Sequence, residues 1–427
     1  MLEVNYIRAN KEVIIERLEA RNIPNKFIVE MLDNAIKIDD ERKNIQTKLD
    51  QLNNKVNVIS KQIGELFKTG KREEAEGLKA EVGLINEQSK TFTEALKEAK
   101  SRLFEHLLEI PNVPHSSVPK GNTDEDNELY KAWEGSLPKL SGEALPHWEL
   151  AEKYQLIDFR LGVKIAGAGF PLYRGKGSKL QRALINFFLD EADKAGYEEI
   201  IPPLLVNEES ARGTGQLPDK EGQMYHVTKD ELYLVPTAEV PLTNIYRDEI
   251  LKESDFPKKI TGYTPCFRRE AGSYGAHVKG LNRVHQFDKI EIVRVEKPED
   301  SYAALEGMVK HVEGLLSKLE LPYRILRLCG GDITFASALT YDFEVFSAAQ
   351  KKWLEVSSVS NFETFQSNRL KLRYKDENGK TKLAHTLNGS ALALARIVAS
   401  MLENHQTDQG IKIPIALVPY TKFDFIN

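Results

Sequence analysis

Two heptad-spaced apolar runs, separated by a short glycine-containing segment, constrain the fold of this chain more than any other feature. Apolar residues recur at alternating steps of four and three from Ile45 to Leu66, and the pattern resumes from Ala75 to Leu103. This spacing is typical of the a/d seam of a coiled coil. Gly70 interrupts the seam, and Pro111 follows its end. We therefore predict two helices that fold back antiparallel, each of about 40 residues and about 60 Å long.

The charge of this predicted arm leaves two interpretations open. Residues 41–100 carry twelve Lys and Arg against ten Asp and Glu, a net charge of +2, whereas the whole chain has a net charge of −5. Lysines spaced along such an arm suit an RNA backbone, recognised by shape and charge. A plain coiled-coil spacer or dimerisation stalk with a solvated face has the same pattern. Without other evidence, the sequence pattern of the arm favours the interpretation as a spacer or stalk.

A second pattern predicts two antiparallel strands joined by a long loop. Apolar and polar residues alternate before Arg268 and again after Phe287, at the period of a strand. Arg268 and Glu270 lie two residues apart, and Arg283 and Phe287 lie four apart, so each pair is predicted to share one face. A guanidinium, a carboxylate and an aromatic ring on one surface suit a nucleotide. A solvated hairpin with ordinary surface charges is the alternative.

These strands resemble a known family. Residues 265–272 and 283–287 are similar to motif 2 of the class II aminoacyl-tRNA synthetases, and 280–291 resembles the seryl-tRNA synthetases in particular. Other segments follow the family's order, and they comprise the helix and strand around Pro203 (motif 1), 234–243 (the Thr-Ala-Glu loop), 353–361 (the metal and ATP strand) and 387–396 (motif 3, which we expect to open a helix). The predicted arm is similar to the family's N-terminal helical arm, which holds the long variable arm of serine tRNA.

The resemblance implies a set of site residues. The implied ATP-binding residues are Arg268, Arg269, Glu270, Phe287, Glu355, Val356, Ser357, Ser358 and Arg396. The implied serine-binding residues are Thr237, Ala238, Glu239, Glu291 and Ser390. Arg268, Glu270 and Arg396 are the implied catalytic residues, and Glu355 with Ser358 would bind Mg²⁺. The chain departs from the family pattern at Val359, where cysteine is common, and at Ala391 and Ala395, where class II proteins often have glycine.

The implied activity is that of a serine–tRNA ligase. Such an enzyme activates L-serine with ATP to seryl-adenylate and transfers the seryl group to the 3′ end of tRNA(Ser); whether tRNA(Sec) is a second acceptor is left open. Arg268 would stabilise charge on the α-phosphate and Arg396 would hold the γ-phosphate, while Phe287 would stack on adenine. Two rival hypotheses are a relative that loads a carrier protein and a non-catalytic coiled-coil RNA-binding protein.

Length and composition set the remaining expectations. With 427 residues the chain is too long for one ordinary domain. We expect an α+β class II catalytic domain at 161–427, with an antiparallel sheet flanked by helices, a linker at 111–160 and an N-terminal tRNA-binding domain with its helical arm at 1–110. Motif 1 implies a homodimer. Two cysteines form neither a disulfide framework nor zinc-ligand spacing, and no apolar run is long enough for a membrane, so we expect a cytoplasmic protein.

Overall fold

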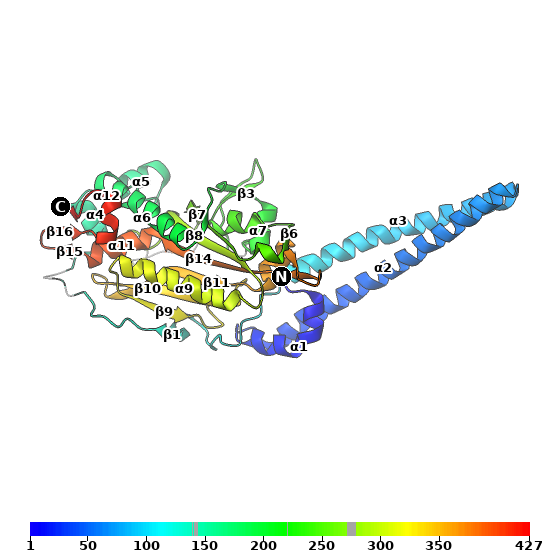
Figure 1. The fold of residues 1–427 in the computed structure, drawn as a ribbon, viewed down its shortest axis with the longest axis horizontal. Coiled ribbons are helices and arrows are strands. Elements are labelled where there is room, and N and C mark those ends of the chain that lie inside the picture. Colours follow the sequence, from blue (N-terminus) through cyan, green and yellow to red (C-terminus); the bar gives the residue numbers. More distant parts are fainter. Residues whose placement is uncertain (139, 141–143, 220, 271–278) are drawn as a thin grey trace. The chain divides into compact units, whose positions relative to one another are not determined.

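The computed structural model describes residues 1–138, 140, 144–219, 221–270 and 279–427 (Figure 1). These residues divide into two compact units. The first comprises Met1–Glu19 and Ile23–Pro111, and the second comprises Ala20–Asn22 and Asn112–Asn427. The first unit is helical and the second combines an antiparallel-rich sheet with helices, which confirms the predicted fold class. No helix among the described residues is long and apolar enough to span a membrane.

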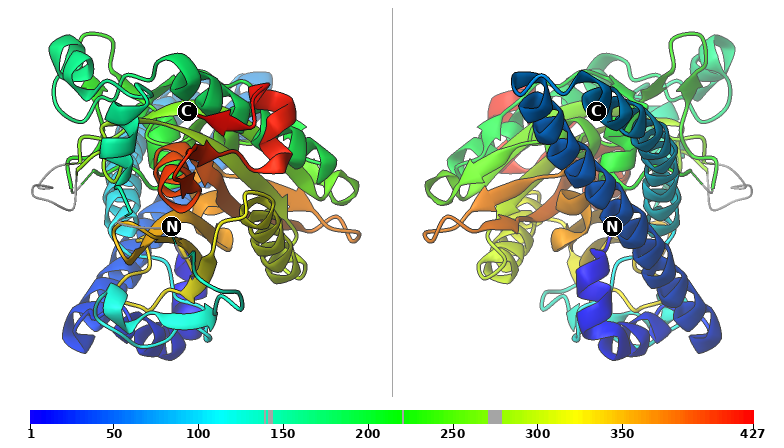
Figure 2. Two further views of the ribbon diagram at one scale, coloured as in Figure 1. Left: turned by 90° about the vertical axis from the view of Figure 1, so that its left-hand side faces the viewer. Right: turned by 90° about the vertical axis from the view of Figure 1, so that its right-hand side faces the viewer.

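The first unit contains the predicted antiparallel arm. Its helices are α1 (Val4–Glu19), α2 (Asn25–Lys68) and α3 (Arg72–Leu108). The two long helices lie side by side (Figure 2). Leu49 and Ile59 of α2 and Ile85 of α3 are buried along the heptad seam, whereas the surrounding charged residues are exposed. Gly70 lies between the helices with φ of +80°, a conformation that glycine adopts without steric cost.

Helix α1 continues through a residue of the type that often caps a helix. Asn10 is a good capping residue, but it lies within α1 at a kink with φ of −128° and ψ of 22°. Ile7, Ile14 and Leu18 are fully buried, so the apolar face of the helix extends one turn before Asn10. Burial of Ile7 therefore overrides the local capping preference of Asn10.

A buried carboxylate stabilises the packing of α1 against α2. Asp39 on α2 forms ion pairs with Arg8 of α1 at 3.1 Å, with Arg42 at 2.7 Å and with Lys43 at 2.9 Å. Burial alone would raise the pKa of Asp39, but hydrogen bonds from Lys43, Arg42 and Arg8 outweigh it and lower the pKa to about 2. The charged form of Asp39 is therefore favoured by the folded state.

The second unit is built on an eight-stranded sheet with the strand order β1-β9-β10-β11-β14-β8-β7-β2. Its strands are β1 (Glu128–Lys131), β2 (Glu198–Glu199), β7 (Lys258–Phe267), β8 (Gln286–Glu296), β9 (Tyr323–Arg327), β10 (Leu339–Ser347), β11 (Lys352–Asn361) and β14 (His385–Ala393). Neighbouring strands are antiparallel except β2 and β7, which are parallel. The order alternates segments far apart in sequence, so the central strands are held by non-local pairing.

One apolar core covers a face of this sheet. Long helices contribute buried side chains to it, namely α6 (Gly175–Lys194), α9 (Ser301–Lys318) and α11 (Leu394–Asn404). The shorter helices are α4 (His147–Lys153), α5 (Phe159–Ala166), α7 (Glu208–Thr214), α8 (Glu239–Asn244), α10 (Thr364–Leu370) and α12 (Val418–Thr421). Ala238, which precedes α8, and Leu242 of α8 pack on the opposite face against Ile260 and Val293, so the sheet is covered on both sides there.

Small sheets and turns complete the second unit. The sheets are β13-β12-β6, β15-β16-β17 and β3-β5-β4. Their strands are β3 (Leu205–Asn207), β4 (His226–Val227), β5 (Leu232–Leu234), β6 (Ile250–Lys252), β12 (Arg373–Lys375), β13 (Thr381–Leu383), β15 (Gln406–Thr407), β16 (Gly410–Lys412) and β17 (Phe425–Ile426). Short 3-10 turns are η1 (Asp124–Asp126), η2 (Glu253–Asp255) and η4 (Ile415–Leu417).

Two predicted elements differ from the structure. The strand expected around Pro203 is interrupted there, because β2 ends at Glu199 and β3 begins at Leu205. Pro202 and Pro203 have no amide hydrogen and cannot continue a hydrogen-bonded ladder. Residues 387–396 were expected to open a helix, but 387–393 belong to β14 and α11 begins only at Leu394. Residues before it pair with β8 and β11, and this non-local pairing outweighs the helical preference of the leucines and alanines.

The Asp39 cluster predicts a pH-dependent contribution to stability. Asp39→Asn should weaken the α1–α2 packing by about 1–3 kcal/mol at pH 7, because it leaves three cations without their shared carboxylate. The pKa of Asp39 is lowered in the folded state, so the contribution is complete above its unfolded pKa near 4 and is lost as pH falls toward 2. Amide hydrogen exchange of α1 and α2 would measure this effect.

The neighbouring Asp40 provides a matched control. Its side chain is 60% exposed and pairs with Arg8 at 2.5 Å. Because exposed ion pairs contribute little, Asp40→Asn should change exchange by less than about 0.5 kcal/mol. Equal protection of the α1 and α2 amides from exchange in Asp39→Asn and Asp40→Asn would contradict a special role for the buried carboxylate.

Candidate active site

Strand register aligns three predicted site positions on one face of the sheet. On β7 and β8, Phe287 is opposite Cys266 and Glu291 is opposite Gly262. Lys289 lies between them on the same face, because side chains of a strand alternate. The intervening Ile290 and Ile292 are fully buried in the core on the other face. On β14, Ser390 is opposite Glu291, so it joins the same face.

Arg268 and Phe287 are brought together at the end of this face. The guanidinium carbon of Arg268 lies 5.3 Å from the centre of the Phe287 ring. Arg268 Nε also donates a hydrogen bond to the Pro236 carbonyl at 3.3 Å. This places a fixed positive charge beside an aromatic ring, as the predicted nucleotide site requires.

Arg269 and Glu270 lie beyond the end of β7. Because the strand ends at Phe267, the expectation that Arg268 and Glu270 share a strand face does not hold. Glu270 has a φ of +47° and forms an ion pair with Arg283 at 3.1 Å. The guanidinium carbon of Arg269 lies 5.9 Å from the centre of the Tyr225 ring. Residues 271 and 272, which end the first segment of the motif 2 match, lie outside the described residues.

Buried polar side chains gather beside the face that carries Phe287, and we call this group the acidic cluster. Thr237 Oγ1 donates to Glu291 Oε2 at 3.3 Å, and Lys289 Nζ lies 2.5 Å from the same oxygen. Gln366 Nε2 donates to Glu239 Oε1 at 2.7 Å. All these side chains are buried. The sequence did not single out Lys289 or Gln366, although Lys289 stands between Phe287 and Glu291 at strand spacing.

The acidic cluster contains two carboxylates and one lysine. Burial, and then the charge of Glu291, raise the pKa of Glu239, which is about 7 in the folded protein. The hydrogen bond from Gln366 and the charges of Lys289 and Arg268 oppose this increase. Ala238, predicted to contact serine, is fully buried among apolar side chains, so its side chain packs in the core.

A β-bulge places Glu355 and Ser358 on the same face of β11. Residues three apart in a regular strand point to opposite faces. Here Ser358 is opposite Asp342 and Glu355 is opposite Glu344, with a register shift between them. Asp342 and Glu344 share one face, so Glu355 and Ser358 share it too. Val356 and Ser357 are buried, which leaves their backbone rather than their side chains available to a ligand.

The chemistry of this face suits a divalent cation. Asp342 Oδ1 is buried and accepts no hydrogen bond from the described residues. Burial, and then the charge of Glu355, raise the pKa of Asp342. A cation beside Glu355 and Ser358 would relieve this repulsion. No cluster of three or more His, Cys, Asp or Glu among the described residues could hold a metal by itself, so substrate oxygens would have to complete a Mg²⁺ site.

Arg396, on the first turn of α11, reaches the same region. Its Nη1 donates to the Glu355 carbonyl at 2.6 Å and lies 3.4 Å from Glu355 Oε2. Its Nε donates to the Asn282 carbonyl at 3.0 Å. The side chain is 28% exposed, so the guanidinium retains access to a ligand. The structure therefore brings Arg396 to the candidate metal strand.

Family models match both units of the chain. Residues 1–114 match the seryl-tRNA synthetase N-terminal domain. Residues 224–405 match the tRNA synthetase class II core domain of the G, H, P, S and T enzymes.

Known proteins resemble the chain over its full length. A serine–tRNA ligase of Salinibacter ruber is 49% identical over 99% of this chain and 98% of its own length. The Pyrococcus horikoshii seryl-tRNA synthetase complexed with ATP superimposes with a TM-score of 0.90 at 32% identity, covering 100% of this chain and 99% of that one. The cytoplasmic serine–tRNA ligase of Naegleria fowleri in complex with AMP gives a TM-score of 0.86 at 27% identity, with the same coverage.

The raised pKa of Glu239 predicts that neutralising this residue stabilises the fold. Between pH 4.5 and about 7 the unfolded carboxyl loses its proton while the folded one keeps it, so stability falls as pH rises through this range. Glu239→Gln should avoid this loss and stabilise the second unit by about 1–3 kcal/mol at pH 8, with little effect at pH 4.5. Thermal melting at both pH values would measure the difference.

Glu291→Gln should have the opposite effect on the stability of the second unit. This substitution would leave buried Lys289 without its carboxylate partner, 2.5 Å away in the native protein. It should therefore destabilise the second unit by about 3 kcal/mol or more at pH 8. Stabilisation by both substitutions would contradict the assignment of Lys289 to Glu291.

Proposed function

Because the chain belongs to the seryl-tRNA synthetase family and is a serine–tRNA ligase, we propose that its acceptor is tRNA(Ser) and that the residues above carry out the two steps. In the first step a serine carboxylate oxygen attacks the α-phosphorus of ATP, forming seryl-adenylate and releasing diphosphate. In the second, the terminal ribose hydroxyl of the tRNA attacks the seryl carbonyl and AMP leaves. Arg268 beside Phe287, next to the buried acidic cluster, is the observation that carries this assignment.

The phosphates of ATP are assigned to the arginines. Arg268 stabilises the charge that develops at the α-phosphate, and Phe287 stacks on adenine. Glu270 binds near adenine, and Arg396 holds the γ-phosphate. Glu355 and Ser358 would hold Mg²⁺, which would supply positive charge that neutralises part of the charge of the phosphates. Preorganised charges act without the solvent reorganisation that water would require.

The acidic cluster is assigned to serine. Its two carboxylates face one buried lysine, so a positively charged amino group would restore charge balance. Glu239 and Thr237 hold this ammonium group, while Glu291 accepts a hydrogen bond from the serine hydroxyl. Ser390 lies opposite Glu291 in the pairing of β14 with β8, and it borders the bound serine. Alanine would leave Glu291 without its partner, which disfavours it by about 10⁴-fold.

The remaining proposals concern partners and location. Residues 1–110 bind tRNA(Ser) through the helical arm, 111–160 link the domains and 161–427 are catalytic. The chain forms a homodimer through the motif 1 region, where Ile201 is 90% exposed and Leu204 and Leu205 are also exposed. A cytoplasmic location is supported by the two free thiols, Cys266 and Cys329.

The first functional test is serine-dependent ATP–pyrophosphate exchange, with alanine and threonine as control amino acids. Arg268→Ala should lower the exchange rate by at least about 100-fold, because the α-phosphate loses its main positive charge. Binding of tRNA should stay within about twofold, since this residue serves activation. Arg160→Ala, the same change at an exposed position of α5, is the control. Equal loss of exchange and tRNA binding in Arg268→Ala would contradict this division of roles.

The arm proposal predicts a change in tRNA charging alone. Lys61 and Lys68 are exposed and one heptad apart, so they lie on one side of α2. Their double substitution to Gln should weaken tRNA affinity about 10-fold and lower the slope of log affinity against log salt by about 2. Serine activation without tRNA should not change.

Glu65→Gln is the matched control, because Glu65 is an exposed acid between the two lysines. Removing this negative charge should leave tRNA affinity unchanged or slightly stronger. Weaker tRNA binding in the control as well would indicate that the arm was disturbed in general.

A further inference from the structure

His147 lies in the segment that the sequence suggests is a linker, but its environment is that of a core residue. It begins α4, and its side chain is fully buried. The side chain of Glu403, near the end of α11, is also fully buried and contacts it. A buried carboxylate is costly unless several donors surround it, so this pair needs an explanation beyond simple packing.

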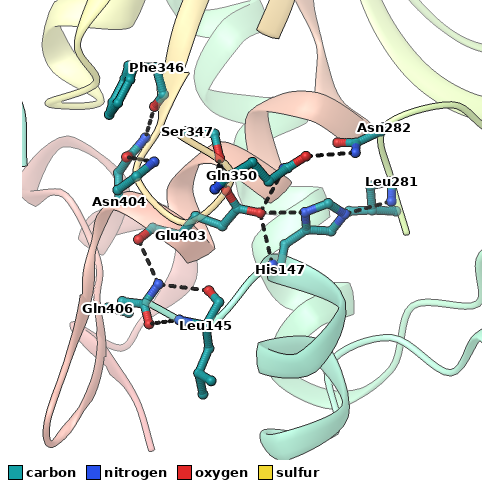
Figure 3. Close-up of polar contacts among 11 residues, drawn as sticks. Leu145, His147, Leu281, Asn282, Phe346, Ser347, Gln350, Glu403, Asn404 and Gln406 are labelled. Atoms are coloured by element: carbon teal, nitrogen blue, oxygen red, sulfur yellow. Dashed lines mark hydrogen bonds and ion pairs between the residues drawn. The ribbon is translucent and has the colours of Figure 1, made fainter. Parts of the chain in front are cut away.

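The hydrogen bonds determine which nitrogen of the neutral His147 ring carries the proton (Figure 3). The backbone amide of Leu281 donates to His147 Nε2 at 2.8 Å, so this nitrogen is an acceptor without a proton. The ring proton of the neutral form is therefore on Nδ1, which donates to Glu403 Oε1 at 2.7 Å. The His147 amide donates to the same oxygen at 2.9 Å.

Glu403 is held by donors from several elements. Ser347 Oγ donates to its Oε2 atom, and Gln350 Nε2 donates to its Oε1 atom at 3.0 Å. Burial alone would raise the pKa of Glu403, but the hydrogen bonds from His147 and Ser347 outweigh it and lower the pKa. The ionised carboxylate is thus the stable form in the folded protein.

The same network extends to the loop that precedes β8. Gln350 Oε1 accepts a hydrogen bond from Asn282 Nδ2 at 3.0 Å, in addition to the bond between Leu281 and His147. Gly280 has a φ of +69°, and a Cβ atom there would lie 2.2 Å from His147 Nε2. Residues 280–282 are therefore fixed by the close approach of Gly280 to His147, by the bond from Leu281 to His147 and by the bond from Asn282 to Gln350.

The loop of residues 280–282 contacts Arg396 directly. The carbonyl of Asn282 accepts the hydrogen bond from Arg396 Nε, and the following residue, Arg283, forms the ion pair with Glu270. Arg396 and Glu403 also share helix α11, seven residues or about two turns apart. The Glu403 network thus fixes both the helix that carries Arg396 and the carbonyl that orients its guanidinium.

We propose that His147, acting with Glu403 and Gln350 through residues 280–282, is a positioning residue that orients Arg396 for ATP. It does not contact substrate. This inference rests on the proposed role of Arg396 as the ligand of the γ-phosphate. Its consequence is a specific loss in ATP binding and serine activation when the contact with Leu281 is broken, with serine affinity retained.

Two substitutions separate the hydrogen bonds of the ring. His147→Asn keeps a donor near the Nδ1 position for Glu403 but loses the acceptor for Leu281. His147→Gln places an acceptor near the Nε2 position and keeps that contact. Misplacement of a catalytic group by about 1 Å can cost up to 100-fold, so we expect His147→Asn to raise KM for ATP and lower kcat, each by about 10-fold. His147→Gln should stay within about threefold of wild type, and KM for serine should change less than about twofold in both.

His405→Asn is the matched control. His405 is a mostly buried histidine that follows α11, and its Nε2 atom bonds to the Leu319 carbonyl at 2.9 Å. Its loss should lower Tm without changing the ratio of the two KM values. Gln350 is only half-buried, so Gln350→Met tests the same loop if the His147 variants fail to fold, with an expected rise in KM for ATP of about 3- to 10-fold.

Three outcomes would overturn the inference. The first is an unchanged KM for ATP in His147→Asn or, if that variant does not fold, in Gln350→Met. The second is an equal effect of His147→Asn and His147→Gln on KM for ATP. The third is a fully additive effect of His147→Asn and Arg396→Lys, because residues acting on one interaction should be non-additive. Calorimetric titration measures the ATP affinity of the same variants directly, so the test remains valid without turnover. Absence of serine-dependent exchange in the wild type would contradict the proposed function instead of this inference.

Discussion

The buried ion pair between Lys289 and Glu291 is the interaction on which the arrangement of the site depends. Both residues come from one strand whose opposite face is packed against apolar helices, so neither charge can reach bulk water. Removing either partner would leave the other as a buried unpaired charge, at a cost of about 3–5 kcal/mol. Glu239 lies near the same lysine, and its pKa is raised by burial and then by the charge of Glu291. The charges of Lys289 and Arg268 favour its ionised form but do not outweigh these two effects.

A buried carboxylate with a raised pKa lowers the stability of the fold at neutral pH, as Glu239 does here. Carboxylates on a surface would have ordinary pKa values and would not oppose folding, but they would bind an amino group weakly because water screens the interaction. Burying them strengthens the interaction and places its cost on the folded protein. Asp342, with one oxygen that accepts no hydrogen bond from the described residues, is a similar case on the neighbouring strands.

The parts of the fold that the sequence predicts are those governed by local spacing. The heptad seam predicts the helical arm because each apolar residue is followed by the next within one turn. Motif resemblance predicts which residues gather at the site, and Arg268, Phe287 and Glu291 do share one region. The boundary between β14 and α11 was predicted wrongly, because pairing with β8 and β11 involves residues far apart in sequence. His147 had no signal of its own, since its partners are more than 100 residues away.

The bulge in β11 has a consequence for how genes of this kind can change. Loss of the Val356 codon would remove the bulge and leave Glu355 and Ser358 two residues apart, a spacing at which a regular strand also turns both side chains to one face. The shared face of the two side chains therefore tolerates a one-codon deletion at position 356, even though the bulge itself does not.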